Sequence, residues 1–306
     1  MRAFALLPLF FVHLVPAQDP LPHSLLWRIQ ASGTSAASYL YGTVHSKDDR
    51  AFQFGDSVLP ALDRCAIAAG ELDLSADKEL GKALFTTMRL PNGQKLVNLY
   101  KKKEWSRVEA AMKDELGFMA PMLSSLKPFF VLAILTENQM NAGVGDQTMV
   151  LDQYLQHRAL NNGKRVIGIE TAAEQIAAID AVPLKVQATM LLDHVDNGGH
   201  PGAMDEMLNA YARQDLEALM AEGEKAGGMP AEFERALLTE RNHRMVERMD
   251  TLLQKGEPVF FLIGAAHLPS PLGLIHGLRA KGYVVEAVMS VHTPPVLLEE
   301  PAIEER

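Results

Sequence analysis

The chain has 306 residues, and its 29 Lys and Arg against 38 Asp and Glu give a formal net charge of −9. An acidic chain without a block of basic residues is a poor partner for nucleic acids or anionic lipids. The only cysteine, Cys65, excludes an internal disulfide. This length is enough to bury a substantial core without such a crosslink.

The first 17 residues have the pattern of a secretory signal. Arg2 precedes an apolar run, and the run is followed by Val15, Pro16 and the small residue Ala17 at a plausible cleavage point. The run is shorter than the roughly 20 apolar residues that span a bilayer, and no later segment is long and apolar enough. We therefore expect a signal peptide over residues 1–17 and a periplasmic or secreted protein. The alternative is an N-terminal helix or strand of a cytosolic protein.

Five short segments rich in apolar and β-branched residues predict buried strands, at 38–45, 65–73, 164–170, 258–267 and 282–288. They lack a clean alternation of apolar and polar residues. Near-continuous apolar runs are typical of a parallel sheet covered on both faces. A helix predicted at 271–282 joins the last two strands into a βαβ unit, which should be right-handed.

The middle of the chain predicts helices. Residues 103–117 place Trp105, Val108 and Met112 at helical spacing, and Thr171 with Glu174 has the spacing of a capping box directly after the third strand.

One motif occurs near both ends of the chain, where a predicted strand runs into Gly-x-x-His at Gly42–His45 and again at Gly264–His267. We therefore predict one α/β domain over residues 18–290. It would have a mostly parallel central sheet built from two related halves and a large helical insertion at about 100–255. The Pro- and Glu-rich segment 291–306 is expected to be a disordered acidic tail.

Polar side chains stand at the carboxyl ends of four predicted strands. His45 ends the first strand, Glu71 the second, Glu170 the third and His267 the fourth. The carboxyl ends of parallel strands share one edge of a sheet, where open α/β folds place their sites. The sequence therefore predicts that these four residues converge.

Two imidazoles with one or two carboxylates form a typical divalent-metal site. Such a metal lowers the pKa of water that it binds toward about 7, and a carboxylate outside the ligand set can act as general base. Structural readings stay open: a histidine at a strand end is often only hydrogen-bonded, and Glu170 before Thr171 could cap a helix.

The sequence resembles the TraB/GumN family from about Ser24 to Val288, through segments 39–50, 66–74, 151–175, 240–249 and 259–288. That family is similar to the TIKI proteins, which are membrane-tethered metal-dependent peptidases, and more distantly to erythromycin esterases. The resemblance implies that His45 and His267 are metal ligands and that Glu71 is the matching acid.

The same resemblance places Glu170 at another recurrent acidic position, and Arg50 and Arg241 at recurrent basic positions. An arginine there could hold a developing oxyanion or a substrate carboxylate. For Arg241, an ion pair on a helix surface is the structural alternative.

We therefore predict an exported metal-dependent hydrolase. It would use Zn, Mn or Co to activate water against an amide or ester bond of a peptide or small molecule. Two alternatives stay open: a metal-free esterase with His45 as base and Glu71 orienting it, and a non-catalytic periplasmic protein that binds a peptide, haem or a polysaccharide intermediate.

Overall fold

The computed structural model describes residues 20–290 apart from 32, 34, 35, 75–86, 141–146, 199–201, 226 and 227. The predicted signal peptide at 1–17 and the predicted tail at 291–306 lie outside the described residues.

The described strands form one sheet in the order β4-β3-β5-β2-β1-β6. The bounds are β1 Leu26–Gln30, β2 Ser38–Thr43, β3 Ile67–Gly70, β4 Arg165–Gly168, β5 Val259–Gly264 and β6 Val284–Ala287. Neighbouring strands from β4 to β2 pair in parallel, whereas β1 is antiparallel to both β2 and β6. The predicted class, α/β with a mostly parallel sheet, is confirmed.

Two features of this sheet were not predicted. Strand β1 is short, and the exposed Arg28 interrupts its apolar run, so its sequence carries little strand signal. Strand β6 lies at the sheet edge beyond β1, and β2 and β1 therefore separate it from β5. The predicted βαβ unit crosses two strands instead of joining neighbours.

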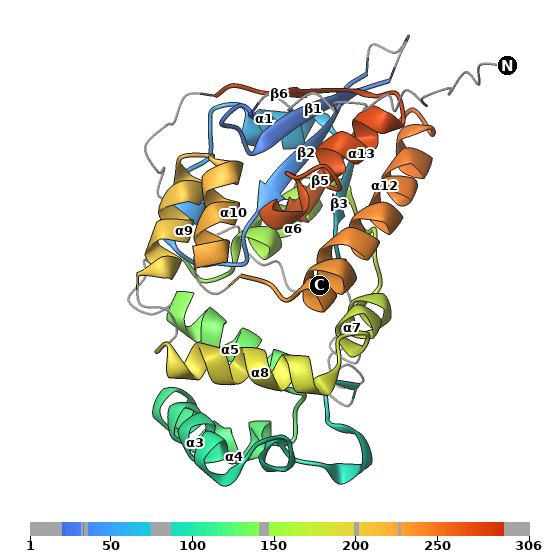
Figure 1. The fold of residues 1–306 in the computed structure, drawn as a ribbon. Coiled ribbons are helices and arrows are strands. Elements are labelled where there is room, and N and C mark those ends of the chain that lie inside the picture. The colour runs from blue at the N-terminus through green and yellow to red at the C-terminus, as the bar shows by residue number, and fades with distance from the viewer. Residues whose placement is uncertain are drawn as a thin grey trace, which may run out of the picture.

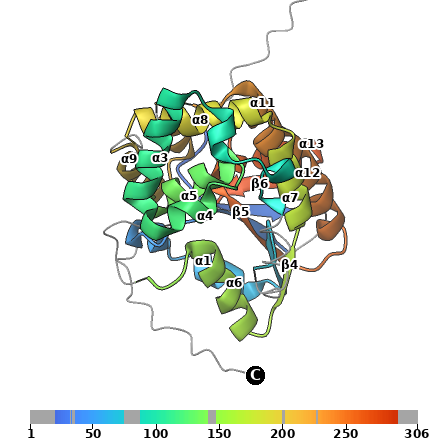
Figure 2. The same cartoon turned by 90° about the horizontal axis from the view of Figure 1, so that it is seen from below.

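Helices cover both faces of the sheet. Figures 1 and 2 show α1 (Val58–Arg64) and α6 (Leu151–Asn161) on one face. On the opposite face lie α9 (Ala203–Ala212), α12 (Glu240–Leu253) and α13 (Leu274–Ala280), with α10 (Leu216–Lys225) packed against α9. The central strand β5 is buried from Val259 to Ile263, as its near-continuous apolar sequence requires.

The other helices of the described residues form a second layer beyond the carboxyl edge of the sheet (Figure 1). They are α3 Lys102–Leu116, α4 Ala120–Leu123, α5 Pro128–Met140, α7 Ala172–Asp180, α8 Leu184–Asp196 and α11 Ala231–Glu234. This helical lobe has its own hydrophobic core, which includes Val108, Met112, Val131, Leu135 and Leu191. Strand β4 and helices α6, α9, α10 and α12 fall within the predicted insertion range but pack in the sheet layer.

No helix in the described part of the chain combines the length and the apolar character that a membrane span requires.

Candidate active site

The predicted polar residues follow the ends of four parallel strands. His45 comes two residues after β2, Glu71 directly after β3, and Glu170 two residues after β4. His267 ends a short 3₁₀ helix, Ala265–His267, that continues from β5. The register pairs Thr43 with Gly264, and the chains leaving the strands turn at one edge of the sheet.

The two Gly-x-x-His motifs lie on adjacent strands, and each glycine makes room for a different neighbour. A Cβ on Gly42 would stand 3.3 Å from Ala265, so this glycine lets the 3₁₀ helix approach β2. A Cβ on Gly264 would stand 3.1 Å from Glu71 Oε1, and the Gly264 N–H donates a hydrogen bond of 2.8 Å to the same oxygen. Gly264 therefore leaves room for the carboxylate of Glu71 and holds it with a backbone hydrogen bond.

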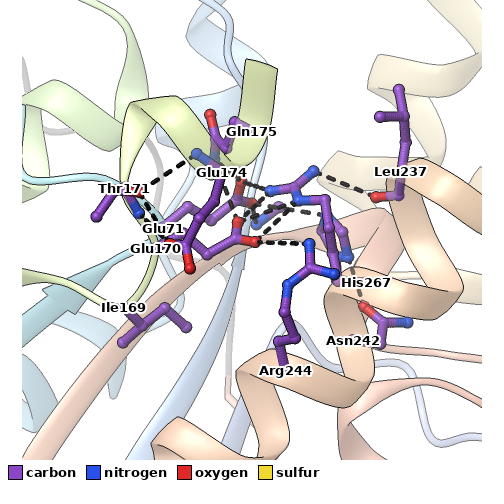
Figure 3. A network of polar contacts seen from close by, with 12 residues as sticks. Glu71, Ile169, Glu170, Thr171, Glu174, Gln175, Leu237, Asn242, Arg244 and His267 are labelled. Atoms are coloured by element: carbon purple, nitrogen blue, oxygen red, sulfur yellow. Dashed lines mark hydrogen bonds and ion pairs between the residues drawn. The ribbon is translucent and has the colours of Figure 1, made fainter. Parts of the chain in front are cut away.

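A buried guanidinium joins the two acids. Arg241 on α12 donates from Nη2 to Glu71 Oε2 and to Glu170 Oε2, each at 2.6 Å, and from Nε to Glu170 at 3.0 Å. Its Nη1 donates to the backbone oxygen of Leu237. Figure 3 shows Glu71 and Glu170 side by side in this network. The side chain of Glu170 is fully buried.

The ionisation of Glu71 is set by opposing effects. Burial favours the neutral acid, but the charge of Arg241 and the hydrogen bonds from Arg241 and the Gly264 N–H act against it, and the pKa of Glu71 is lowered overall. Burial likewise works against the charge of Arg241, but its hydrogen bonds to Glu170 and the charge of Glu71 raise its pKa overall. Both groups are therefore charged near neutral pH.

His267 is buried, and its ring is held by a side chain of α12. Its Nδ1 lies 2.5 Å from Asn242 Oδ1 (Figure 3). An amide oxygen only accepts, so Nδ1 carries the proton and Nε2 keeps a lone pair. That Nε2 lies 3.9 Å from Glu71 Oε1. Burial lowers the pKa of His267, which keeps the imidazole neutral.

His45 faces a different acid. Its Nδ1 lies 3.7 Å from Asp152 Oδ2, an oxygen that is buried without a hydrogen bond, while Asp152 Oδ1 accepts a hydrogen bond from Thr43. The interaction with Asp152 raises the pKa of His45. The imidazole of His45 is 58 % exposed, in contrast to that of His267.

Two cavities meet at His45. A polar cavity of about 240 Å³ is lined by Thr43, His45, Glu71, Asp152, Gln156 and Gln175, among others. A second cavity of about 260 Å³ shares Thr43, His45 and Gly264 with the first, but its other walls are largely apolar. Glu170 and Arg241 line neither cavity.

Arg50 lies apart from this network. It pairs with Asp48 at 2.6 Å and with Asp205 at 2.9 Å, and it donates to Asn209 on α9. It lines neither cavity. In this structure Arg50 joins the loop after β2 to α9.

Several residues of the site were not predicted from the sequence. Asp152 and Gln156 come from α6, Gln175 from α7 and Asn242 from α12. Asp152 and Gln156 are four residues apart and so share one helix face. That pattern, in a helix whose Leu151 and Leu155 are buried, was the available signal. Asn242 lies in segment 240–249, which carries the family resemblance, but only Arg241 was singled out there.

The donor groups fit a metal ion in part. His267 presents a neutral, tautomer-fixed nitrogen toward an anionic carboxylate oxygen of Glu71, an arrangement typical of metal ligands. His45 lines the same cavity as Glu71, but its ring turns toward Asp152. Among the described residues, no three His, Cys, Asp or Glu side chains cluster closely enough to hold a metal ion as they stand.

The fold and the site together define an α/β protein with imidazole and acidic groups gathered at the carboxyl edge of its sheet. A model of the TraB/PrgY/gumN family matches residues 25–287. The chain belongs to this family, as the sequence resemblance predicted.

Among curated proteins, the chain is similar to a metalloprotease TIKI homolog of Nematostella vectensis, with 24% identity over 87% of this chain and 67% of that protein. It is also similar to metalloprotease TIKI2 of Danio rerio, with 23% identity over 94% of this chain and 64% of the relative. Metalloprotease TIKI1 of Danio rerio matches with 24% identity over 89% of this chain and 63% of the relative. The chain thus spans about two thirds of the length of these relatives. No solved structure gave a significant match.

Proposed function

We propose that this protein is a metal-dependent hydrolase that cleaves an amide bond of a peptide at the carboxyl edge of its sheet. The observation that carries the proposal is the pairing of His267 and Glu71. A buried, neutral imidazole places its unprotonated Nε2 3.9 Å from an oxygen of a carboxylate that Arg241 and Gly264 keep charged. The names of the TIKI relatives support the same reaction class.

In this proposal His267, Glu71 and His45 would hold the ion, which would be Zn, Mn or Co. When bound, a divalent metal would supply a Lewis acid that polarises the carbonyl and acidifies water. Two further side chains of the protein position these ligands. Asn242 fixes the tautomer of His267, and Arg241 positions Glu71 through a charge-assisted hydrogen bond.

The metal claim is tested by metal content. Purified protein is analysed by mass spectrometry for bound metal, beside His45→Ala and His267→Ala variants and a His276→Ala control on α13. We expect about one equivalent in the wild type and the control, and a large loss in the two site variants. Negligible metal in all four proteins, with peptide hydrolysis that survives a strong chelator, would remove the metal from the proposal.

A second candidate, metal-free hydrolysis, is favoured by one observation. His45 lies beside Asp152, and an imidazole paired with a carboxylate can act as a general base. The predicted partner of His45 was Glu71, and the geometry favours Asp152 instead. In this case Asp152→Asn abolishes hydrolysis while a chelator leaves it unchanged. Retention of a peptide ligand without turnover would favour the binding-protein alternative.

We also propose that the protein is exported, because residues 1–17 have the composition of a signal peptide. The test is the intact mass of the protein recovered from the periplasmic or secreted fraction of the producing cells. Loss of the N-terminal segment near Ala17 is expected. A full-length protein found only in the cytoplasm would contradict export.

A further inference from the structure

The second cavity at the site lies directly beside the reacting groups. It shares Thr43, His45 and Gly264 with the polar cavity that contains Glu71. A substrate whose scissile bond lies next to His45 and Glu71 would therefore extend a neighbouring group into this second cavity. It is called the side pocket below.

The walls of the side pocket are apolar and adaptable. They include Met207 from α9, Leu219 and Met220 from α10, Leu238, Ala265 and Ala266. Methionine side chains are flexible and polarisable, and they adapt to apolar groups of different shape. Such walls favour a hydrocarbon or aromatic group over a sugar, whose hydroxyls would lose hydrogen bonds to water there.

The size of the side pocket limits its occupant. At about 260 Å³ it exceeds the roughly 150 Å³ of an engineered cavity that holds benzene. It falls short of the roughly 300–1,000 Å³ of sites that enclose a whole drug-sized ligand. One side chain of the size of leucine, methionine or phenylalanine fits these limits, whereas haem does not.

Two carboxylates at the side pocket favour a positively charged group of the substrate next to the apolar side chain that the pocket would hold. Glu224 and Glu234 both line the pocket and are exposed. Within the described residues, neither of them forms an ion pair with a lysine or arginine. The acidic chain as a whole, with its net charge of −9, would also attract a cationic substrate.

We propose that the side pocket is a specificity site for a peptide. It takes a large apolar side chain next to the scissile bond, with a basic residue beside it. This inference rests on the hydrolase function proposed above, because it places the scissile bond next to His45.

Gly223 offers a way to block the side pocket without disturbing the fold. It lines the pocket from within α10, and a Cβ added to it would meet no atom within 4 Å. Replacing a helical glycine also favours the helix. Gly223→Leu should therefore fold and fill the pocket. Ala221→Leu, two residues earlier on α10 and exposed outside the pocket, is the matched control.

The first measurement is cleavage of a quenched-fluorescent peptide series that varies one residue beside the scissile bond. For wild type and Ala221→Leu, kcat/KM should be at least about tenfold higher with Leu, Met or Phe than with Gly, the scale on which pockets distinguish apolar groups. For Gly223→Leu this preference should disappear while cleavage of the Gly peptide persists. An unchanged preference in Gly223→Leu would overturn the inference and leave the proposed hydrolase intact.

The second measurement separates the pocket from the chemistry. Binding of Leu- and Gly-containing peptides is followed by fluorescence anisotropy, with a reduced CH₂–NH bond in place of the scissile amide so that no hydrolysis is needed. Leu-selective binding that Gly223→Leu abolishes supports the pocket even if no peptide is cleaved.

A double variant tests the role of the two carboxylates at the side pocket. Glu224→Gln with Glu234→Gln should remove the preference for Arg or Lys beside the apolar residue, and should weaken the salt dependence of binding. A basic preference that survives in this double variant would overturn the charged part of the inference.

Discussion

Arg241 is the residue on which the acidic pair of the site depends. It is 9% exposed, and its hydrogen bonds go to Glu71, Glu170 and the backbone of Leu237. The sequence resemblance left two roles open, an oxyanion holder or a surface ion pair. The structure places it instead in a buried ion pair, which suits a positioning residue.

Arg241→Met should destabilise the protein strongly, because it leaves the fully buried Glu170 without the cation that donates hydrogen bonds to it. Breaking a buried pair in this way costs about 3–5 kcal/mol. The free energy of unfolding is measured in urea. Arg244→Met is the control, since Arg244 lies 3.9 Å from Glu170 and is partly exposed, and should cost less than about 1 kcal/mol. Equal, small losses in the two variants would contradict the role given to Arg241.

Asp152 should control the protonation of His45. Its carboxylate is the main cause of the raised pKa of this imidazole, so Asp152→Asn should lower the pKa of His45. The measurement is an NMR titration of the His45 ring. Glu137→Gln is the matched control, because Glu137 contributes only a smaller electrostatic effect. The assignment of Asp152 would be wrong if both variants shifted the titration equally.

The part of the site that lies on strands was predictable, and the part that lies on helices was not. Glu71, Glu170 and His267 meet because parallel strands end at the same edge of the sheet. A sequence pattern that predicts such strands therefore also predicts that the residues at their carboxyl ends lie together. Asp152 and Asn242 reach the site through the rotation of α6 and α12 about their axes. That rotation is fixed by packing against the sheet, which no local pattern in the sequence specifies.

At the scale of elements, the start of α7 follows its sequence signal closely. Thr171 Oγ1 accepts a hydrogen bond from the Glu174 N–H at 3.3 Å, and the Thr171 N–H donates to Glu174 Oε2 at 2.8 Å. This is the predicted capping box. Arg248 on α12 adds an ion pair to Glu174 that no sequence pattern indicates.

The capping box should give stability that depends on pH. The hydrogen bond from Arg248 is the main cause that lowers the pKa of Glu174 to about 2, below its ordinary value of 4.5. A carboxylate whose pKa is lowered by folding stabilises the folded protein at pH values above its ordinary pKa. This stabilisation is lost as the pH falls from the ordinary pKa toward the lowered pKa. Glu174→Gln should therefore destabilise the protein by about 1 kcal/mol at pH 7. The difference from wild type should vanish between about pH 4.5 and 2.

Thermal unfolding at several pH values measures this effect. Arg248→Gln is the companion variant, and it should remove most of the same pH-dependent difference because it takes away the main cause of the shift. A Glu174→Gln deficit that is constant from pH 7 to pH 2 would contradict the role of the charge.

The strands show where local pattern succeeds and where it fails. All five predicted strands exist, and four of them end before the polar residue that was included at their carboxyl end. Glu71, Glu170 and His45 lie in the loops that follow the strands, and His267 ends the 3₁₀ helix after β5. Strand β1 has too few apolar residues to be recognised alone. Its place in the sheet comes from antiparallel pairing with β2, the next strand in the sequence, and with β6, which is far from both in the sequence.

At the scale of the whole molecule, the described residues form two hydrophobic cores. The first lies around the sheet, and the second lies in the helical lobe. The second core includes Phe233, Ala236 and Leu237, which belong to α11 and to the π-helical turn Arg235–Thr239 that leads into α12. The lobe is therefore continuous with the segment that carries Arg241.

This continuity predicts that the lobe helps to hold the site. Leu237→Ala and Leu135→Ala remove the same methyl-bearing groups from the same core, and each should destabilise the protein by about 2–5 kcal/mol. Only Leu237 also offers its carbonyl to Arg241, so a cavity there should loosen the guanidinium as well. The readout is the NMR signal of the Arg241 Nε–H, which the hydrogen bonds to Glu170 protect from exchange. Its exchange with solvent should be faster in Leu237→Ala than in Leu135→Ala when both are compared at conditions where they are fully folded. Equal exchange rates in the two variants would mean that the lobe stabilises the fold without supporting the acidic pair.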